Sequence, residues 1–267
     1  MRSCVVTGAA AGLGRAIALE LASDGWAIAA VDVDEPGLEA LRREAGSAVV
    51  AVVGDVAERS TSETARSVAT ELGELAGWVN NAGIDLPGAA HALTEADMHR
   101  LLDVNLVSVI WGCREAIGHF LERGGGAIVS ISSIQAICGF PESFVYAATK
   151  GGINSLTRQI ATEYGPFGIR ANAVMPGAFR TKMAIESWER TSDPSAAERD
   201  DARLHPLGRL GEPREVGATV AFLLSDDASF VSGQCIAVDG AASARCFAYP
   251  PNQELVERYR LASGDKR

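Results

Sequence analysis

Tyr146 and Lys150 are four positions apart in a stretch with helical periodicity. Residues at i and i+4 lie on the same face of a helix, so the phenol and the ammonium are expected to be neighbours. A free tyrosine has a pKa of about 10 and is a poor base at neutral pH. A nearby cation stabilises the phenolate and lowers that pKa, which suits proton exchange with a hydroxyl or carbonyl oxygen.

Ser133 is a second candidate for the same chemistry, because it precedes Tyr146 and follows a predicted strand. Ligands of open parallel sheets bind at the carboxyl ends of the strands, where the Ser133 hydroxyl could hold a substrate oxygen. A serine after a strand is also common as a turn residue or a helix cap. The spacing of Tyr146 and Lys150 also occurs on solvated helix faces, so these residues alone do not define an enzyme.

The segment Thr7–Gly14 is rich in glycine and lies between the first predicted strand and the first predicted helix. Gly8, Gly12 and Gly14 would let the backbone approach a pyrophosphate, which the helix N-terminus attracts. The spacing G-x-x-x-G-x-G differs from the common G-x-G-x-x-G, and a glycine-rich turn without a ligand is the alternative interpretation. Asp32 ends the second predicted strand, where a carboxylate accepts hydrogen bonds from the adenosine ribose and repels a 2′-phosphate. This favours NAD over NADP.

Short apolar runs alternate with helical patterns along the chain, as in βαβ units. We expect a single α/β domain over residues 1–240, with a doubly wound, parallel, seven-stranded sheet of the Rossmann type and helices on both faces. Residues 177–208 form a long mixed segment that we interpret as a substrate lid, and residues 241–267 form a C-terminal extension. The predicted strands are 3–6, 26–31, 48–53, 78–80, 126–130, 169–174 and 235–238, and the predicted helices are 13–23, 35–44, 61–72, 94–122, 146–164 and 213–224.

Composition narrows the class of protein. The 267 residues have 24 basic and 34 acidic side chains, a net charge of −10, which disfavours a nucleic-acid partner. The apolar runs are far shorter than the roughly 20 residues of a membrane span. Five scattered cysteines and the absence of a signal-peptide pattern indicate a cytoplasmic protein without disulfides. The histidines show no metal-ligand spacing, so we expect no metal site.

From residue 3 to about residue 240 the sequence resembles the short-chain dehydrogenase/reductase family. The motifs that match are TGAAAGLG (7–14), DV (55–56), NNAG (80–83), Asn105, SISS (130–133), YAATK (146–150), PGAFRT (176–181), GRLGEP (208–213) and SGQCIAVDG (232–240). Their order and spacing make the resemblance highly specific. The family often has a second glycine after the final Asp-Gly, where this chain has Ala241.

The resemblance implies a catalytic tetrad of Asn105, Ser133, Tyr146 and Lys150. Tyr146 would be the general acid/base, and Ser133 would orient the substrate oxygen. Lys150 would bind the nicotinamide ribose and lower the pKa of Tyr146, while Asn105 would hold a water that links Lys150 to bulk solvent.

The resemblance also implies where NAD binds and which atoms react. Hydride would pass between NAD and a secondary alcohol or ketone. From its place at the strand end, and not from the resemblance, Gln135 is expected beside Ser133 and Tyr146 as a further substrate contact, with a surface-loop amide as the alternative. The implied cofactor contacts are Gly8, Gly12, Leu13, Gly14, Asp32, Asp55, Val56, Asn81, Ala82, Gly83, Tyr146, Lys150, Pro176, Gly177, Phe179 and Thr181.

The expected partner is a small alcohol or ketone, and the apolar residues on two predicted helices, 94–122 and 146–164, favour a homodimer or homotetramer. We expect the aromatic residues from Phe247 onward to pack on a neighbouring subunit near the lid. Two other functions stay open, namely a 3-oxoacyl-thioester reductase and a catalytically silent NAD-binding protein. The substrate is not defined by the sequence.

Overall fold

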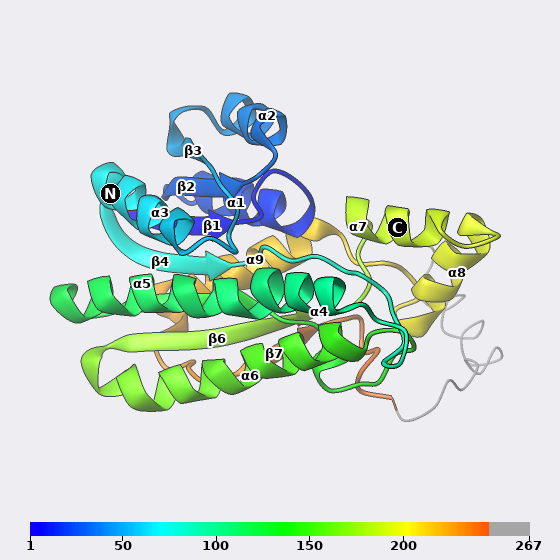
Figure 1. Cartoon of the computed structure of the whole chain (residues 1–267). Helices are drawn as coiled ribbons and strands as arrows, with labels where there is room; N and C mark the ends of the chain where they lie inside the picture. The colour runs from blue at the N-terminus through cyan, green and yellow to red at the C-terminus, as the bar shows by residue number, and fades with distance from the viewer. Residues whose placement is uncertain (246–267) are drawn as a thin grey trace, which may run out of the picture.

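The structure is a computed structural model that describes residues 1–245, and its centre is one parallel sheet (Figure 1). The strand order is β3-β2-β1-β4-β5-β6-β7, so the chain begins in the middle of the sheet, runs to one edge, returns, and runs to the other. The order reverses between β1 and β4, which creates a crevice at the carboxyl ends of these strands. The strands are β1 (Arg2–Thr7), β2 (Ala27–Asp32), β3 (Val49–Val53), β4 (Glu74–Asn80), β5 (Gly126–Ile131), β6 (Ile169–Pro176) and β7 (Cys235–Val238).

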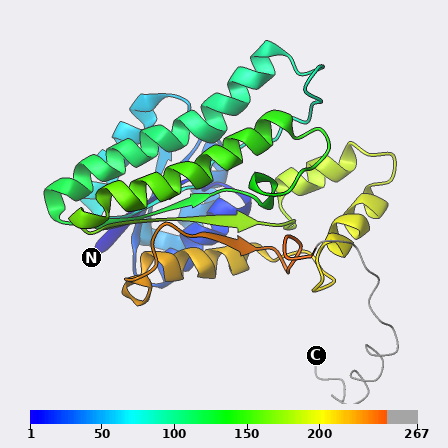
Figure 2. The ribbon, with the colours of Figure 1, turned by 90° about the horizontal axis from the view of Figure 1, so that it is seen from below.

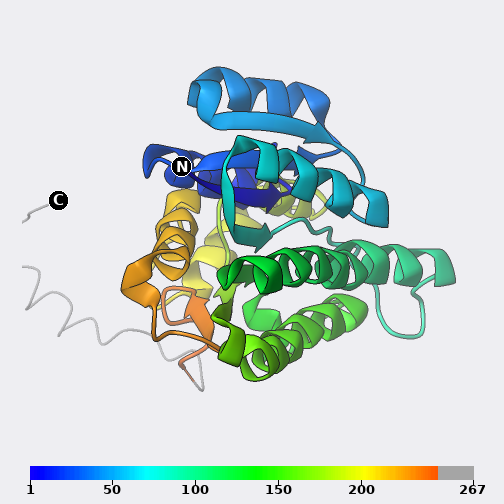
Figure 3. The ribbon, with the colours of Figure 1, turned by 90° about the vertical axis from the view of Figure 1, so that its left-hand side faces the viewer.

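All seven predicted strands are confirmed, and helices cover both faces of the sheet as predicted. Figure 3 shows the layers, with α9 on one side of the sheet and α5 and α6 on the other. Alternate residues of β1 enter two separate cores, Cys4 and Val6 with α1, α2 and α9, and Val5 with α3, α5 and α6. These helices are α1 (Gly12–Ser23), α2 (Glu35–Ala45), α3 (Arg59–Leu72), α5 (Ser108–Arg123), α6 (Phe144–Tyr164) and α9 (Pro213–Leu224).

The predicted continuous helix over 94–122 is wrong in one respect. It is divided into α4 (Glu95–Leu102), a π-helical turn at Asp103–Val107, and α5. Apolar periodicity did not reveal the π turn, because the turn has only five residues and the helical pattern continues on both sides of it. Such turns are frequent at functional sites, and this one contains Asn105.

The predicted lid contains two helices that the sequence analysis did not anticipate, α7 (Lys182–Glu189) and α8 (Pro194–Leu204). They lie beyond the carboxyl ends of the strands and away from the two long helices α5 and α6 (Figure 2). Among residues 1–245, no helix has the length and apolar character needed to span a membrane. The C-terminal extension is described only as far as Arg245, so the predicted packing of Phe247 and the residues after it lies outside the described part of the chain.

Candidate active site

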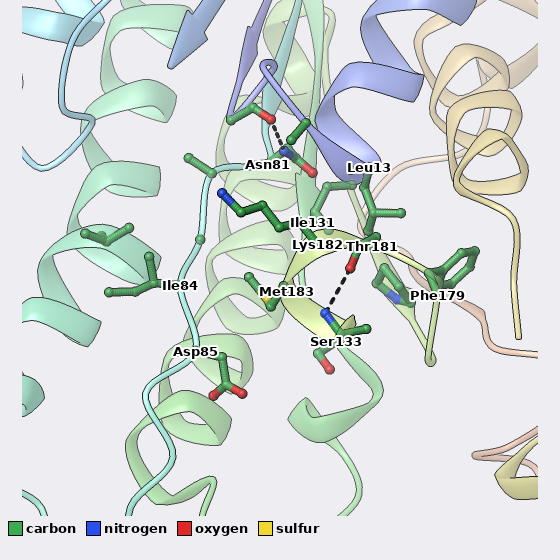
Figure 4. A pocket seen from close by; sticks show the side chains of 18 of the residues that line it. Leu13, Asn81, Ile84, Asp85, Ile131, Ser133, Phe179, Thr181, Lys182 and Met183 are labelled. Atoms are coloured by element: carbon green, nitrogen blue, oxygen red, sulfur yellow. Dashed lines mark hydrogen bonds between the residues drawn. The ribbon is translucent and has the colours of Figure 1, made fainter. Parts of the chain in front are cut away.

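A cavity of about 480 Å³ opens at the carboxyl ends of the strands, between the sheet and the lid helices. It brings together residues that are far apart in the sequence, as the close view in Figure 4 shows. The predicted site residues that line it are Gly8, Gly12, Leu13, Asp32, Asp55, Val56, Asn81, Ala82, Gly83, Ser133, Gln135, Tyr146, Lys150, Pro176, Gly177, Phe179 and Thr181. Two predicted site residues, Gly14 and Asn105, do not line the cavity.

The glycine-rich turn has the backbone that an anion site needs. Gly8 and Gly12 have φ angles of 65° and 55°, in the left-handed region that glycine adopts without strain. Ala11, the N-cap of α1, provides no side-chain oxygen for the first amides of the helix, and the first turn contains no acidic residue. These amides and the positive end of the helix dipole fit a pyrophosphate.

Gly14 serves the turn differently from the prediction. A Cβ atom at this position would collide with the carbonyl oxygen of Gly8 and with the side chain of Asn81. Gly14 therefore allows α1 to pack closely against the turn, and it has no direct contact with the cavity.

Two carboxylates that line the cavity are held by the backbone. Asp32 accepts hydrogen bonds from Ala10 N at 2.9 Å and from Asp34 N at 3.1 Å. Asp55 accepts from Ala57 N at 2.9 Å and forms an ion pair with Arg100 at 3.0 Å. Arg100, which sequence reasoning missed, thus has its charge offset by Asp55.

Asn81 connects the turn to the loop after β4, and Figure 4 shows it beside Leu13 at one end of the cavity. Its side-chain amide donates to Thr7 O at 2.9 Å and to Gly8 O at 3.2 Å. The Thr7 hydroxyl in turn accepts from Asn81 N at 2.9 Å and from Ala82 N at 3.0 Å. The two sides of the crevice are therefore fixed relative to each other.

Asn105 is fully buried and bonds the same loop from the opposite side. Its Oδ1 accepts from Ile84 N and its Nδ2 donates to Ile84 O, both at 2.8 Å. Both polar atoms of the side chain already have a protein partner. This does not favour the prediction that the Asn105 side chain binds a water of a proton relay. The side chain therefore joins α4 and α5 to the loop after β4.

Lys150 and Tyr146 occupy one face of α6, as predicted. The Lys150 ammonium is 5.4 Å from the centre of the Tyr146 ring and donates to Ile131 O at 2.9 Å. Lys150 is only 3% exposed, and this burial lowers the pKa of its amine to about 8. The Ser133 hydroxyl accepts from Gln135 N at 3.1 Å, so Ser133 is a cap as well as a cavity residue.

The acidity of Tyr146 differs from the expectation. Burial, assisted by the negative charge of Asp85, raises the pKa of Tyr146 to about 12, and the Ser133 hydroxyl opposes this shift. Without a cofactor the environment therefore favours the neutral phenol. The predicted lowering of this pKa by Lys150 is absent in the chain alone, because burial disfavours charge on both side chains.

Three side chains hold the lid segment together. Thr181 caps α7 by accepting from Ala184 N at 3.3 Å. His205 is buried at the end of α8, where its Nε2 accepts from Ala178 N and its Nδ1 lies 2.9 Å from Asp201 O. Trp188 of α7 donates from its indole to the Asp201 carboxylate at 2.6 Å, which ties α7 to α8.

Sequence reasoning missed several cavity residues beyond Arg100. The signal for one of them was available, since Asp85 follows the NNAG motif directly after Ile84, at the carboxyl end of β4. The others belong to lid helices that showed no clear pattern. The missed cavity residues include Asp85, Met183, Ser187 and Asp201.

The sheet order, the glycine turn at its switch point and the facing Ser133, Tyr146 and Lys150 define a Rossmann-type oxidoreductase. The sequence model of the family described as "Enoyl-(Acyl carrier protein) reductase" matches residues 8–242. The chain belongs to the short-chain dehydrogenase/reductase family, whose members generally use NAD(P), and it is an oxidoreductase that acts on CH–OH groups.

Individual relatives match over most of their length. Levodione reductase of Leifsonia aquatica is 37% identical over 91% of this chain and 94% of its own. 3beta-hydroxysteroid dehydrogenase 1 of Eggerthella lenta is 39% identical over 90% of this chain and 92% of its own. The crystal structure of levodione reductase superposes with a TM-score of 0.88 at 36% identity, covering 91% of this chain and 98% of that one.

Proposed function

We propose that the chain transfers hydride between NAD and a secondary alcohol or ketone, with Tyr146 as the general acid/base. The observation that supports this most is the composition of one cavity. The glycine turn and Asp32 line it together with Ser133, Tyr146 and Lys150, so a cofactor and a substrate would share one open cavity.

In this proposal the cofactor is held along the carboxyl ends of the strands. Gly8, Gly12 and Leu13 would hold the pyrophosphate, and Asp32 the adenosine ribose. The nicotinamide ring accepts or supplies the hydride when bound. The remaining proposed contacts of the cofactor are Asp55, Val56, Asn81, Ala82, Gly83, Pro176, Gly177, Phe179 and Thr181.

The protein's own contribution is to move a proton and to stabilise charge on the substrate oxygen. In oxidation the phenolate form of Tyr146 takes the hydroxyl proton, and in reduction its phenol donates a proton to the carbonyl oxygen. Ser133 holds that oxygen, and Lys150 binds the nicotinamide ribose. Asn105 acts by positioning the loop after β4. The relay water expected at Asn105 would bind its main chain, because both polar atoms of the side chain are bonded to Ile84.

Asp32 supports NAD rather than NADP as the cofactor. Its carboxylate is held in place by two backbone amides at 2.9 and 3.1 Å, and it would repel a phosphate on the ribose. We expect kcat/KM with NAD⁺ to exceed that with NADP⁺ by about a hundredfold. Asp32→Ala should reduce this ratio at least tenfold, and a wild-type preference for NADP⁺ would refute the assignment.

The central experiment replaces Tyr146 with Phe. The cyclic secondary alcohols named in several relatives, such as cyclohexanol for the dehydrogenase of Acinetobacter, are suitable first substrates. Turnover should fall by about 10³-fold or more while NADH binding, read by its fluorescence, persists. Undiminished turnover would refute the role of Tyr146.

Turnover and substrate preference of the wild type separate the alternatives. A catalytically silent NAD-binding protein would show no turnover in the wild type. The family description, which names acyl carrier protein, keeps a 3-oxoacyl-thioester reductase as the second candidate. Such an enzyme would prefer 3-oxoacyl thioesters to cyclic ketones.

We also propose a cytoplasmic homodimer or homotetramer formed through α5 and α6. Ile110 and Leu121 on α5 are 42% and 44% exposed, and Phe144 at the start of α6 is 65% exposed. Light scattering after gel filtration measures the assembly. Deletion from Phe247 onward tests whether the C-terminal extension contributes to assembly or to the Michaelis constant.

A further inference from the structure

Asp85 is a cavity carboxylate that the proposed chemistry does not use. It follows the loop bonded by Asn105 and lies at the end of the cavity where Ser133 is found, opposite Leu13 and Asn81 (Figure 4). It is half-buried, and among residues 1–245 its side chain has no hydrogen bond and no ion pair. Arg190, just beyond the end of α7, is the cation that acts on it, without forming an ion pair.

The negative charge of Asp85 is not stabilised by a nearby hydrogen-bond donor from the described residues. Burial raises the pKa of its carboxyl group, and the charge of Asp85 raises the pKa of Tyr146. A half-buried carboxylate is stabilised by a donor or a cation. The titratable and charged groups that line the cavity with it are Asp32, Asp55, Arg100, Tyr146, Lys150, Lys182 and Asp201.

Arg100, Lys182 and Asp201 already have partners among the described residues. Arg100 bonds Asp55 at 3.0 Å, Lys182 lies 3.8 Å from Glu186, and Asp201 accepts from Trp188. Asp85 is therefore the carboxylate on the substrate side that stays available to a ligand in the described part of the chain.

Gln135 adds a second acceptor to the same cavity, two residues after Ser133. Its Oε1 is buried and has no hydrogen-bond partner among the described residues. A buried oxygen without a donor costs free energy, so this amide also gains from a ligand that donates.

We propose that Asp85, with Gln135 beside Ser133, selects secondary alcohols that carry a second hydrogen-bond donor, a further hydroxyl or a protonated amine, and rejects anionic ones. This inference rests on the proposed function, whose substrate class it narrows. A donor bound to Asp85 offsets its charge, which also makes the Tyr146 phenolate less costly to form. Substrate selection and proton transfer are thereby linked through one carboxylate.

The test compares four cyclic alcohols that differ in one substituent. The probes are cyclohexanol, 1,2-cyclohexanediol, 2-aminocyclohexanol and 2-hydroxycyclohexanecarboxylate. For the wild type, kcat/KM of the diol and the amino alcohol should exceed that of cyclohexanol by about tenfold, and the carboxylate should be the poorest substrate.

Two substitutions separate charge from hydrogen bonding. Asp85→Asn should abolish the rejection of the carboxylate and keep part of the preference for the diol, whereas Asp85→Leu should lose both. Asp85→Asn should also move the rising limb of the pH profile of kcat/KM for alcohol oxidation to lower pH, because the charge that raises the pKa of Tyr146 is removed. The control Asp227→Asn alters an exposed carboxylate far from the cavity and should change no ratio.

The outcomes distinguish the inference from the proposed function. Equal substrate ratios in the wild type and in Asp85→Leu, with cyclohexanol still oxidised, would overturn the inference alone. Binding of the four probes to the enzyme–NADH complex gives a ranking without turnover. The expected ranking without any turnover would support Asp85 and refute the proposed function, and the absence of both would refute the two together.

Discussion

Asn105 and Ile84 are joined by two hydrogen bonds of 2.8 Å, one in each direction, between a side-chain amide and a backbone peptide group. The π-helical turn presents the amide, and the partner belongs to the loop that follows β4. This loop lines the cavity on either side of the bond, with Gly83 before it and Asp85 after it. The helix pair α4 and α5 therefore fixes the backbone on which the substrate and the cofactor would rest.

We expect Asn105→Ala to reduce kcat/KM by about 10- to 100-fold, because loss of both bonds lets the loop move and small displacements of reacting groups are costly. The free energy of unfolding should also fall, by about 1–3 kcal/mol, since the Ile84 peptide loses its partners. Steady-state kinetics and denaturant unfolding measure the two effects.

Asn172 offers a matched control. It is 1% exposed and also bonds the backbone twice, to Val231 O at 2.8 Å and from Gln234 N at 3.1 Å, but it does not line the cavity. Asn172→Ala should lose a similar amount of stability and leave kcat/KM of the folded enzyme within about threefold. Equal kinetic losses in the two variants would show that Asn105 is merely structural.

Lys150 should make the stability of the ligand-free protein depend on pH. Burial lowers the pKa of its amine from 10.5 to about 8 in the folded state. Between these values the unfolded state binds more protons than the folded state, so the free energy of unfolding rises with pH across this window. From about pH 7.5 to about pH 9.5 the contribution is on the order of 2 kcal/mol.

The control for this prediction is Lys150→Met, which removes the titrating group. Burial raises the pKa of the Cys4 and Cys113 thiols, and because their unfolded forms ionise first, they lower stability as pH rises. These opposing effects cancel in the difference between wild type and variant. That difference, from denaturant unfolding, should change by on the order of 2 kcal/mol in favour of the wild type as pH rises. A constant difference would mean that Lys150 is not shielded from water.

The sheet and most of the cavity could be predicted because their signals are local. Buried parallel strands are short and apolar on both faces. The glycine-rich turn that ends at Gly12 marks the start of α1 beside the crevice between β1 and β4. The lid helices were harder to predict from the sequence. One of them, α8, has no buried residue and hence no apolar stripe. Its start did have a signal, because Asp193 before Pro194 accepts from Ala196 N at 2.9 Å as an N-cap.

The remaining differences depend on tertiary contacts that no local pattern encodes. Gly14 is explained by a close approach to Gly8, and the acidity of Tyr146 by burial together with Asp85. The spacing of Tyr146 and Lys150 predicted their proximity, which the distance of 5.4 Å confirms. It could not predict that both would be so shielded from water that their charged forms are disfavoured.

His205 should position the loop that passes the proposed nicotinamide site. Its ring bonds Ala178 N on that loop and lies 2.9 Å from Asp201 O on the lid, so one side chain joins the two segments. We expect His205→Phe, which keeps the ring volume, to raise KM for the cofactor about tenfold with a smaller change in kcat. His99→Phe alters an exposed histidine on α4 and should change neither constant. An unchanged KM with a lower Tm would restrict His205 to a structural role.

Ala241 occupies the position where the family often has a second glycine, and its φ of 70° lies in the left-handed region. A non-glycine residue in this conformation costs about 1–2 kcal/mol of stability. Substitution by glycine removes this cost but recovers only part of it as stability, because glycine loses more backbone entropy on folding. Ala241→Gly should therefore stabilise the protein by up to about 1 kcal/mol and raise Tm by about 2–4 °C. Ala242 is the matched control, since its φ is not positive, and Ala242→Gly should lower Tm. Calorimetry of both variants decides the matter, because a lower Tm for Ala241→Gly would mean that contacts of the Ala241 methyl group outweigh the backbone strain.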